Sequence, residues 1–141
     1  MESINQLTQR IIGAAIEVHR QKGPGLLESV YESCLAHELE SCGLQVARQV
    51  PVPLVYKAIT IDIAFRADLI VENCVLVELK AIETVLPVHK AQLLSYIREA
   101  GRPIGLLINF HSAKLVDGIT RIANDRVLSV SSASSVLKNR V

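Results

Sequence analysis

The chain has 141 residues, of which 50% are hydrophobic and 21% are charged, and this is enough for one folded domain with a buried core. With 15 Lys and Arg against 14 Asp and Glu the net charge is +1, which excludes nucleic-acid binding through a uniformly basic surface. No apolar run is long enough to span a membrane, and three cysteines without paired spacing indicate a reducing, cytoplasmic location.

Hydrophobic periodicity predicts two helices at the beginning of the chain. Apolar residues three or four positions apart predict a helix over residues 4–21, with Ser3 as its N-cap. Gly23-Pro24-Gly25 ends this helix and turns the chain. A second helix is expected over residues 27–42, and Gly43 closes it.

Alternating hydrophobicity predicts three strands after the helices. They are expected over residues 46–56, 60–71 and 74–82, and a tight Glu72-Asn73 turn joins the second strand to the third. Two prolines in the first strand each lack an N–H donor, so we place this strand at an edge of the sheet.

The remaining part of the chain contains one further helix and one buried strand. The helix is expected over residues 90–100, and residues 104–110 form a continuous apolar run that is typical of a strand buried on both faces. Residues 115–123 have helical spacing and predict a weaker helix. The Ser-rich tail 125–141 contains residues 127–130, which could add a short strand.

Together these elements predict one α/β domain over residues 1–124, in the order ααβββαβ(α). Three meandering strands, a crossover helix and a returning strand make a mixed sheet flanked by helices. So small a domain offers little surface for binding a nucleic acid alone, and we therefore expect a homodimer, formed either through the outer side of the edge strand 46–56 or through helix faces.

Charged residues inside otherwise apolar strands are the candidates for chemistry. Asp68 lies in the strand 60–71, and Glu78 and Lys80 share one face of the strand 74–82. Pairing of these strands around the predicted turn brings the two carboxylates together, which is stable only with a cation or a proton between them. Oxygen ligands without suitably spaced His or Cys indicate Mg²⁺ or Mn²⁺ and not Zn²⁺.

Each of these residues also has a purely structural interpretation. Asp68, Glu78 and Lys80 could form a partly exposed salt bridge on a sheet with one solvent-exposed face. Glu28, in the first turn of the second helix, could supply a further carboxylate to the metal, or it could be an ordinary acid that the helix dipole favours.

Several segments resemble one known family. Asp68, Glu78 and Lys80 make a D-x(9)-E-x-K run that resembles the core of the PD-(D/E)xK nuclease superfamily. Gly25-Leu-Leu-Glu28-Ser-Val-Tyr31 is similar to the signature of the GxxExxY family within that superfamily. Further similar segments are YKAITIDIAFRADLIVE, VELKAIE, PVHKAQLLSYI and GLLINF, and the resemblance extends over residues 4–124.

This resemblance implies a restriction-endonuclease-like fold and a nuclease that depends on Mg²⁺ or Mn²⁺ and acts on DNA more than on RNA. Asp68, Glu78 and Glu28, with the Leu79 carbonyl, are then the expected metal ligands. The metal acidifies a bound water, and Lys80 beside it could take the proton of that water or orient it.

A Gln and a Tyr on the third helix are also implied. Gln92 and Tyr96 are four positions apart, hence on one face, and they resemble a pair that lines the site in exonuclease-like branches of the superfamily. Tyr96 could equally be core packing with its hydroxyl at the rim.

Five residues are weaker candidates for substrate binding. A tyrosine three positions after Glu28 could orient that carboxylate, basic residues could form a phosphate-binding rim, and two histidines flank elements of the expected site. The same side chains could instead be solvated, or could cap helices. These five residues are Tyr31, Arg66, His19, His89 and Lys90.

Two functions of other classes compete with a nuclease. One is a non-catalytic module that binds nucleic acid or protein and keeps the nuclease fold, which the small size and low net charge favour. The other is a structural homodimer with a fortuitous acidic pocket, which the high hydrophobic content allows. Specific binding of Mg²⁺ would count against a purely structural protein.

Overall fold

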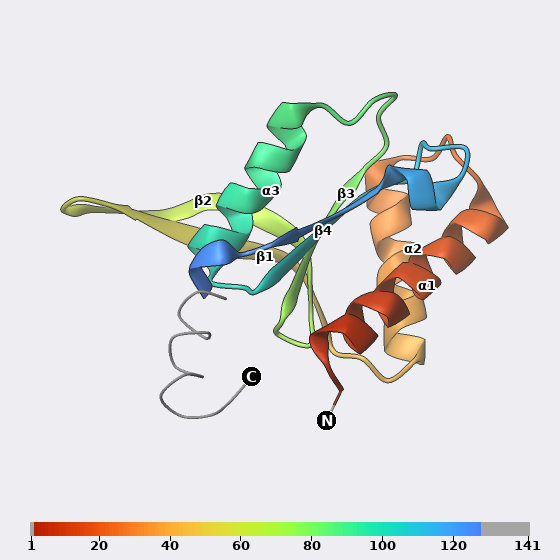
Figure 1. Ribbon diagram of the computed structural model, residues 1–141, viewed down its shortest axis with the longest axis horizontal. Helices are drawn as coiled ribbons and strands as arrows, with labels where there is room; N and C mark the ends of the chain where they lie inside the picture. The colour runs from red at the N-terminus through yellow and green to blue at the C-terminus, as the bar shows by residue number, and fades with distance from the viewer. Residues whose placement is uncertain (1, 128–141) are drawn as a thin grey trace.

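The computed structural model describes residues 2–127 (Figure 1). A five-stranded sheet forms its centre, with α1 (Ile4–Lys22) and α2 (Glu28–Ser41) packed on one face and α3 (Pro87–Ala100) on the other. The predicted α/β class, with a mixed sheet and flanking helices, is therefore confirmed. No helix within the described residues is both long and apolar enough to cross a membrane.

The first helix begins and ends where its sequence signals lie. The Ser3 hydroxyl accepts the N–H of Gln6, and the Gln6 side chain accepts the N–H of Ser3, so α1 begins with a capping box. Gly23 ends α1 with a φ of 66°, a backbone conformation that other residues rarely adopt.

The sheet has the strand order β1-β2-β3-β4-β5. Its strands are β1 (Val46–Tyr56), β2 (Ile59–Val71), β3 (Val75–Lys80), β4 (Ile104–Asn109) and β5 (Ile119–Ala123). β3 and β4 pair in parallel with α3 as the crossover, and all other neighbours pair antiparallel. β1 lies at an edge of the sheet, as its prolines predicted.

The predicted turn between β2 and β3 is confirmed. Glu72 and Asn73 both have positive φ, 53° and 52°, as the tight turns of hairpins require. The Cys74 N–H closes this turn by donating to the Val71 carbonyl at 2.9 Å. The hairpin register that brings polar residues of β2 and β3 together is therefore fixed locally.

The helix predicted over residues 115–123 is wrong. Leu115–Gly118 forms a single 3-10 turn, η1, and Ile119–Ala123 forms β5, which pairs with β4. Apolar spacing favours a helix locally, but the free edge of β4 supplies backbone partners for a strand, and this tertiary pairing prevails. Val127 belongs to a helical turn over residues 125–127, and the rest of the predicted short strand lies outside the described residues.

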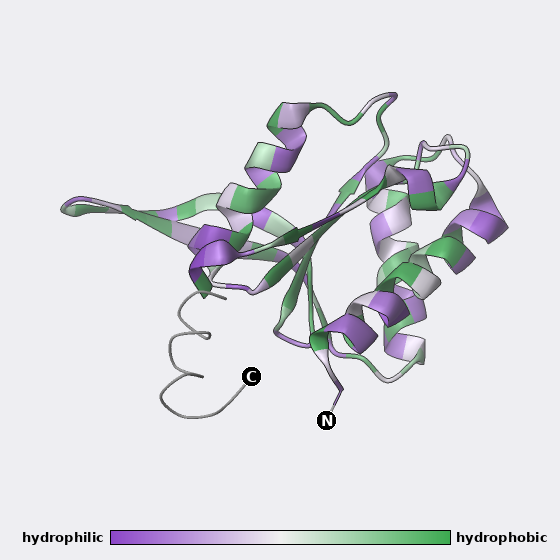
Figure 2. Cartoon of the chain, in the orientation of Figure 1, coloured by the Kyte–Doolittle hydropathy of each residue, from purple (hydrophilic) through white to green (hydrophobic). Residues whose placement is uncertain are grey.

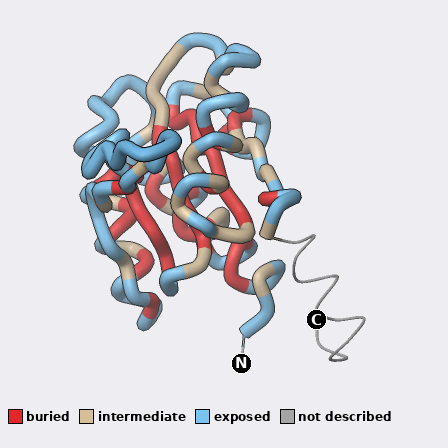
Figure 3. Tube along the Cα trace, turned by 90° about the vertical axis from the view of Figure 1, so that its left-hand side faces the viewer, coloured by how far each residue is buried: buried red, intermediate tan, exposed pale blue. Residues whose placement is uncertain are grey.

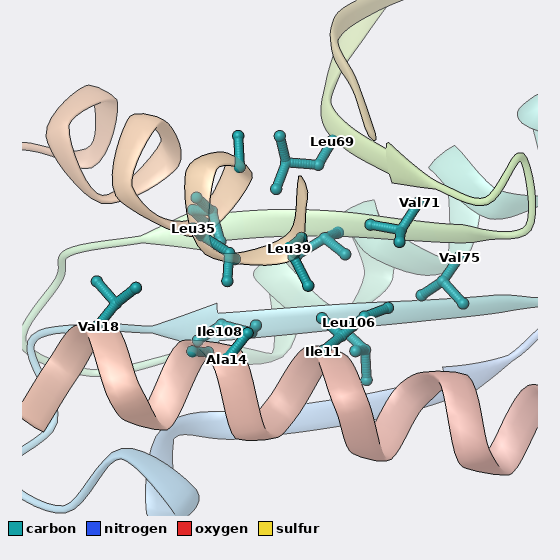
Figure 4. Close-up of a cluster of buried hydrophobic side chains, with 14 of the residues drawn as sticks. Ile11, Ala14, Val18, Leu35, Leu39, Leu69, Val71, Val75, Leu106 and Ile108 are labelled. Atoms are coloured by element: carbon teal, nitrogen blue, oxygen red, sulfur yellow. The ribbon is translucent and has the colours of Figure 1, made fainter. Parts of the chain in front are cut away.

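Two hydrophobic clusters hold the layers together. The larger cluster lies between the sheet and the helices α1 and α2 (Figure 4). The smaller cluster lies beneath α3, where Leu93 and Ile97 pack on Leu76 and Leu107. Figure 3 shows that the central strands are buried between these layers. Charged residues at the ends of these strands are thus held on a rigid scaffold.

The far end of the β1–β2 hairpin projects beyond the rest of the domain (Figure 1). We call residues 53–65 the hairpin arm. Figure 2 shows hydrophobic residues along this arm. The exposed large apolar side chains of the arm are Val55, Tyr56, Ile59, Ile61 and Ile63.

Candidate active site

Asp68 and Glu78 lie side by side where β2 and β3 separate. Counted outward from the turn, backbone pairing between these strands ends at Leu69 and Val77. At the next position the Asp68 N–H donates to Glu78 Oε1 at 3.1 Å, and the Leu79 N–H donates to Asp68 Oδ2 at 2.8 Å. Carboxylate oxygens thus replace the backbone carbonyls that would accept these bonds in a regular sheet. We call Asp68 and Glu78, with the strand ends that carry them, the strand fork.

Burial raises the pKa of both carboxyl groups, and the Asp68 charge adds to the rise at Glu78. Burial, followed by the Asp68 charge, raises the pKa of Glu78 to about 8, against a smaller opposing effect of Lys80. Burial also raises the pKa of Asp68, although the hydrogen bonds from Leu79 and Gln49 oppose this rise. The strand fork therefore favours a proton or a cation between the two carboxyl groups.

Lys80 lies on the same face of β3 as Glu78. Leu76 packs beneath α3, whereas Val77 and Leu79 pack toward α1 and α2, so alternation places Glu78 and Lys80 on the α3 side. Lys80 is half-buried, and its positive charge favours the ionised form of Glu78. The ammonium group is therefore close enough to Glu78 to influence its charge.

Glu28 reaches the same end of β3 from the start of α2. Its Oε2 accepts the N–H of Ala81, the residue after β3, at 3.3 Å. The Glu28 charge contributes to the raised pKa of Asp68 and of Glu78, which places its carboxylate near both. Glu28 is nevertheless exposed, and its side chain contacts the backbone at the rim of the fork.

The chemistry of the strand fork suits a hard divalent cation. Asp68 and Glu78 offer crowded oxygen donors, which Mg²⁺ and Mn²⁺ prefer, and a cation would relieve their repulsion. Within residues 2–127, however, no group of three or more His, Cys, Asp or Glu side chains is arranged to hold a metal ion. The candidate ligand set is therefore the carboxylate pair, completed by backbone oxygen or water.

Tyr31 does not orient Glu28, contrary to the prediction. Its hydroxyl donates to the Gly23 carbonyl at 2.5 Å and accepts the Leu26 N–H at 3.1 Å. The ring is fully buried and stacks on Phe110 with a centroid distance of 4.4 Å. Because the hydroxyl is used within the loop before α2, Tyr31 fixes this loop and is not available to a substrate.

Tyr96 reaches the site from α3, whereas Gln92 makes no polar contact there. The Tyr96 ring stacks on Phe65 of β2 at 3.9 Å. Burial, followed by the charges of Glu78 and Asp68, raises the pKa of the Tyr96 hydroxyl, so that hydroxyl lies near the carboxylate pair. Gln92 lies one turn earlier and is exposed.

The two histidines each make one hydrogen bond that holds the fold together, and phosphate binding by either histidine stays a prediction. His19 Nε2 donates to the Ser112 carbonyl at 2.8 Å, and this bond joins α1 to the loop after β4. His89 Nδ1 accepts the N–H of Leu86 at 2.8 Å at the start of α3. Each histidine thus uses one ring nitrogen to hold the fold together.

The two basic candidates are exposed and lie in different places. Arg66 is on β2, two positions before Asp68. Lys90 lines a separate hollow with Asn109 and Thr120, beside the ends of β4 and β5. Arg66 therefore remains a candidate at the strand fork, and Lys90 a candidate in a hollow whose Asn109 pairs with the last residue of β3.

The sequence analysis missed Glu32 and Gln49, which adjoin the site. Glu32 is 7% exposed, and its Oε1 accepts from the Gln49 amide at 2.5 Å. The same amide donates to Asp68 Oδ1 at 3.3 Å. Glu32 follows Glu28 by four positions and lies between the buried Tyr31 and Leu35, so a carboxylate on the apolar face of α2 was the available signal.

A mixed sheet with an acidic pair and a lysine at a strand fork defines an α/β domain of the restriction-endonuclease-like class. A family model described as the PD-(D/E)XK nuclease superfamily matches residues 5–122. The chain belongs to this superfamily, which generally comprises nucleases. Searches of curated proteins and of solved structures found no match to the chain.

Proposed function

We propose that the protein is a nuclease that uses Mg²⁺ or Mn²⁺ to hydrolyse phosphodiester bonds of nucleic acid, of DNA more than of RNA. The observation that carries this proposal is the pair of half-buried Asp68 and buried Glu78 beside Lys80, in a chain of this superfamily. The Gly25, Glu28 and Tyr31 signature supports membership of the GxxExxY family. The three free cysteines agree with a cytoplasmic location.

Asp68, Glu78 and the Leu79 carbonyl would hold the metal, with Glu28 reached directly or through water. The ion supplies a more acidic bound water and positive charge for the phosphate in the transition state. Lys80 Nζ, on the same face as Glu78, would orient the attacking water or hold its proton. Tyr96 and Gln92 would line the side of the site formed by α3.

Divalent-dependent cleavage tests this proposal. Single-stranded, duplex and branched DNA, and RNA, are incubated with the protein and Mg²⁺ or Mn²⁺, with EDTA as the metal-free control. We expect cleavage of at least one substrate. The cleavage rate should fall about a hundredfold or more in Lys80→Ala and should be unchanged in Lys114→Ala, the control at an exposed residue. Absence of metal-dependent cleavage of every substrate would contradict the proposal.

One observation favours a non-catalytic binding module as the second candidate. No three-ligand group exists among the described residues, in which Glu28 Oε2 accepts the backbone N–H of Ala81. Calorimetry with Mn²⁺ separates the two functions: a nuclease binds the ion at the strand fork and loses this binding in Asp68→Asn. In a binding module a proton neutralises the repulsion within the acidic pair, and no ion binds there.

We further propose that two copies of the chain associate through the hairpin arm. Val55, Tyr56, Ile59, Ile61 and Ile63 are 68, 58, 57, 43 and 51% exposed. Tyr56, Ile59, Ile61 and Ile63 share one face of the arm, with Val55 on the other, and these four make a patch on the order of 400 Å², within the range of the largest patches that monomeric proteins expose. This is about half of the about 800 Å² per partner that a stable interface buries.

The chemistry of the arm favours a second copy over nucleic acid. Lys57 is the one basic residue within the arm and Asp62 its one acidic residue, so the arm offers little charge for phosphates. Pro51 and Pro53 remove N–H donors from β1, which makes its outer edge a poor template for an added strand. The remaining arrangement is one in which the apolar face of one arm packs on the same face of a second copy, across a twofold axis.

Sedimentation equilibrium tests this association. We expect a dimer at micromolar concentration, and a monomer for Ile61→Lys, which places a charge in the apolar patch. Val116→Lys is the control, because Val116 is exposed at 45% in η1, away from the arm. A monomeric unmodified chain, or an Ile61→Lys dimer as tight as the control, would refute the association through the arm.

A further inference from the structure

A chain of polar contacts leads from an exposed arginine to the strand fork. Arg48 pairs with Glu32 Oε2, with 3.0 Å between its guanidinium and that oxygen, and also donates to the Ser33 hydroxyl at 2.9 Å. Glu32 Oε1 in turn accepts from the Gln49 amide, which donates to Asp68 Oδ1. The amide nitrogen of Gln49 therefore donates both to a nearly buried carboxylate and to the site.

The backbone at Gln49 is strained in a way that aims this side chain. Its φ is 50°, a region that Asn, Asp and Gly enter much more readily than Gln. Before Gln49, Val46 packs toward α1 and α2, and after it Val52 packs beneath α3, so β1 turns its side chains over at this residue. The conformation does not explain a glutamine here, whereas its two amide contacts do.

The two oxygens of the Asp68 carboxylate accept hydrogen bonds from different donors. Oδ2 accepts the Leu79 N–H and Oδ1 accepts the Gln49 amide, so both ends of the carboxylate are fixed. Gln49 is neutral, so it orients Asp68 without placing a cation that would compete with a metal. The positive charge of Arg48 stays one residue away, where it is balanced by Glu32.

We propose that Gln49, held by Glu32, is a positioning residue that fixes the Asp68 carboxylate for metal binding at the strand fork. This inference rests on the proposed function. Outer residues that orient a ligand typically change metal affinity by about ten- to a hundredfold when they are replaced. Gln49 acts through Asp68 and touches neither metal nor substrate.

Gln49→Asn separates this role from a structural one. Asn tolerates a positive φ better than Gln, which offsets part of the stability lost with the bond to Glu32, and its amide is one methylene too short to reach both Glu32 and Asp68. We expect Mn²⁺ affinity, measured by calorimetry with the metal alone, to fall about tenfold or more. The control is Gln45→Asn, an exposed glutamine just before β1, with unchanged affinity.

A second variant tests whether Glu32 acts through Gln49. Glu32→Gln keeps the shape of the side chain and should weaken Mn²⁺ binding less than Gln49→Asn does. The double variant should bind no more weakly than Gln49→Asn alone, because both changes remove the same contact. Additive losses, or unchanged affinity in Gln49→Asn, would overturn the proposal.

Crystal structures of the metal-free protein provide a readout that does not depend on metal binding. In Gln49→Asn we expect the Asp68 carboxylate to leave its bond with the Leu79 N–H or to occupy more than one conformer. An unchanged Asp68 side chain would refute the positioning role. If the unmodified protein binds no Mn²⁺, the proposed function fails, and these structures still decide whether Gln49 fixes Asp68.

Discussion

The raised pKa of Glu78 makes a definite prediction about stability in the absence of metal. The pKa rises from 4.5 to about 8 on folding, so the folded protein holds this proton more tightly than the unfolded chain does. The resulting stabilisation is complete below about pH 4.5 and is lost as the pH rises through about 8. At about 1.4 kcal/mol per pKa unit it amounts to on the order of 5 kcal/mol.

Glu78→Gln removes this dependence, because glutamine has the shape and the neutral charge of the protonated acid. Its side-chain carbonyl can still accept the Asp68 N–H, so the strand fork keeps its hydrogen bond. We expect the variant to match the unmodified protein near pH 5 and to exceed its free energy of unfolding by a few kcal/mol near pH 9. A smaller slope remains, since the pKa of Asp68 is also raised.

Urea denaturation in EDTA between pH 5 and 9 measures this difference. Glu99→Gln, an exposed glutamate of α3, is the matched control and should follow the unmodified protein. If Glu78→Gln has the same pH slope as the control, the Glu78 proton does not govern stability. If the variant unfolds at every pH, Glu78 is instead a structural ion-pair partner.

Three further substitutions test the surroundings of the site. Glu28→Asp withdraws the carboxylate by one methylene and should lower metal-dependent turnover about a hundredfold with little change in melting temperature. Equal turnover in Glu28→Asp, Glu28→Gln and the unmodified protein would show that Glu28 is an ordinary acid at the start of a helix. Tyr31→Phe should lower the free energy of unfolding by about 1–3 kcal/mol, because the Leu26 N–H and the Gly23 carbonyl lose their partner. Urea denaturation measures this loss, and an unchanged free energy of unfolding would show that water replaces the hydroxyl. Gly105→Ala should destabilise by about 1–3 kcal/mol in the same assay, because the new Cβ would lie 2.7 Å from Ile97 and 2.8 Å from Leu93, and unchanged stability would mean that α3 moves away freely.

The carboxylate pair was predictable because its cause is local. Alternation fixed which residues of β3 face α3, and the Glu72-Asn73 turn set the register that places Asp68 opposite Glu78. Ser3 and Gly23 marked the ends of α1 for the same reason, since capping depends on neighbours in the chain.

The features that were missed depend on contacts between distant segments. β5 forms because β4 offers a free edge, and apolar spacing within residues 119–123 does not reveal that edge. The burial of Glu32 depends on β1 crossing α2, and the strained backbone of Gln49 has no signature in its residue type. Tyr31 was placed near Glu28 by spacing alone, whereas the position of Gly23 decided its hydrogen bonds.

The strand fork links occupancy of the site to the behaviour of two backbone amides. The N–H groups of Asp68 and Leu79 donate to the carboxylates that would also hold a metal. An ion that tightens these carboxylates therefore slows amide hydrogen exchange at both positions, whereas deprotonation without metal drives the carboxylates apart and speeds it. Exchange rates of these two amides thus report whether the fork is closed or open.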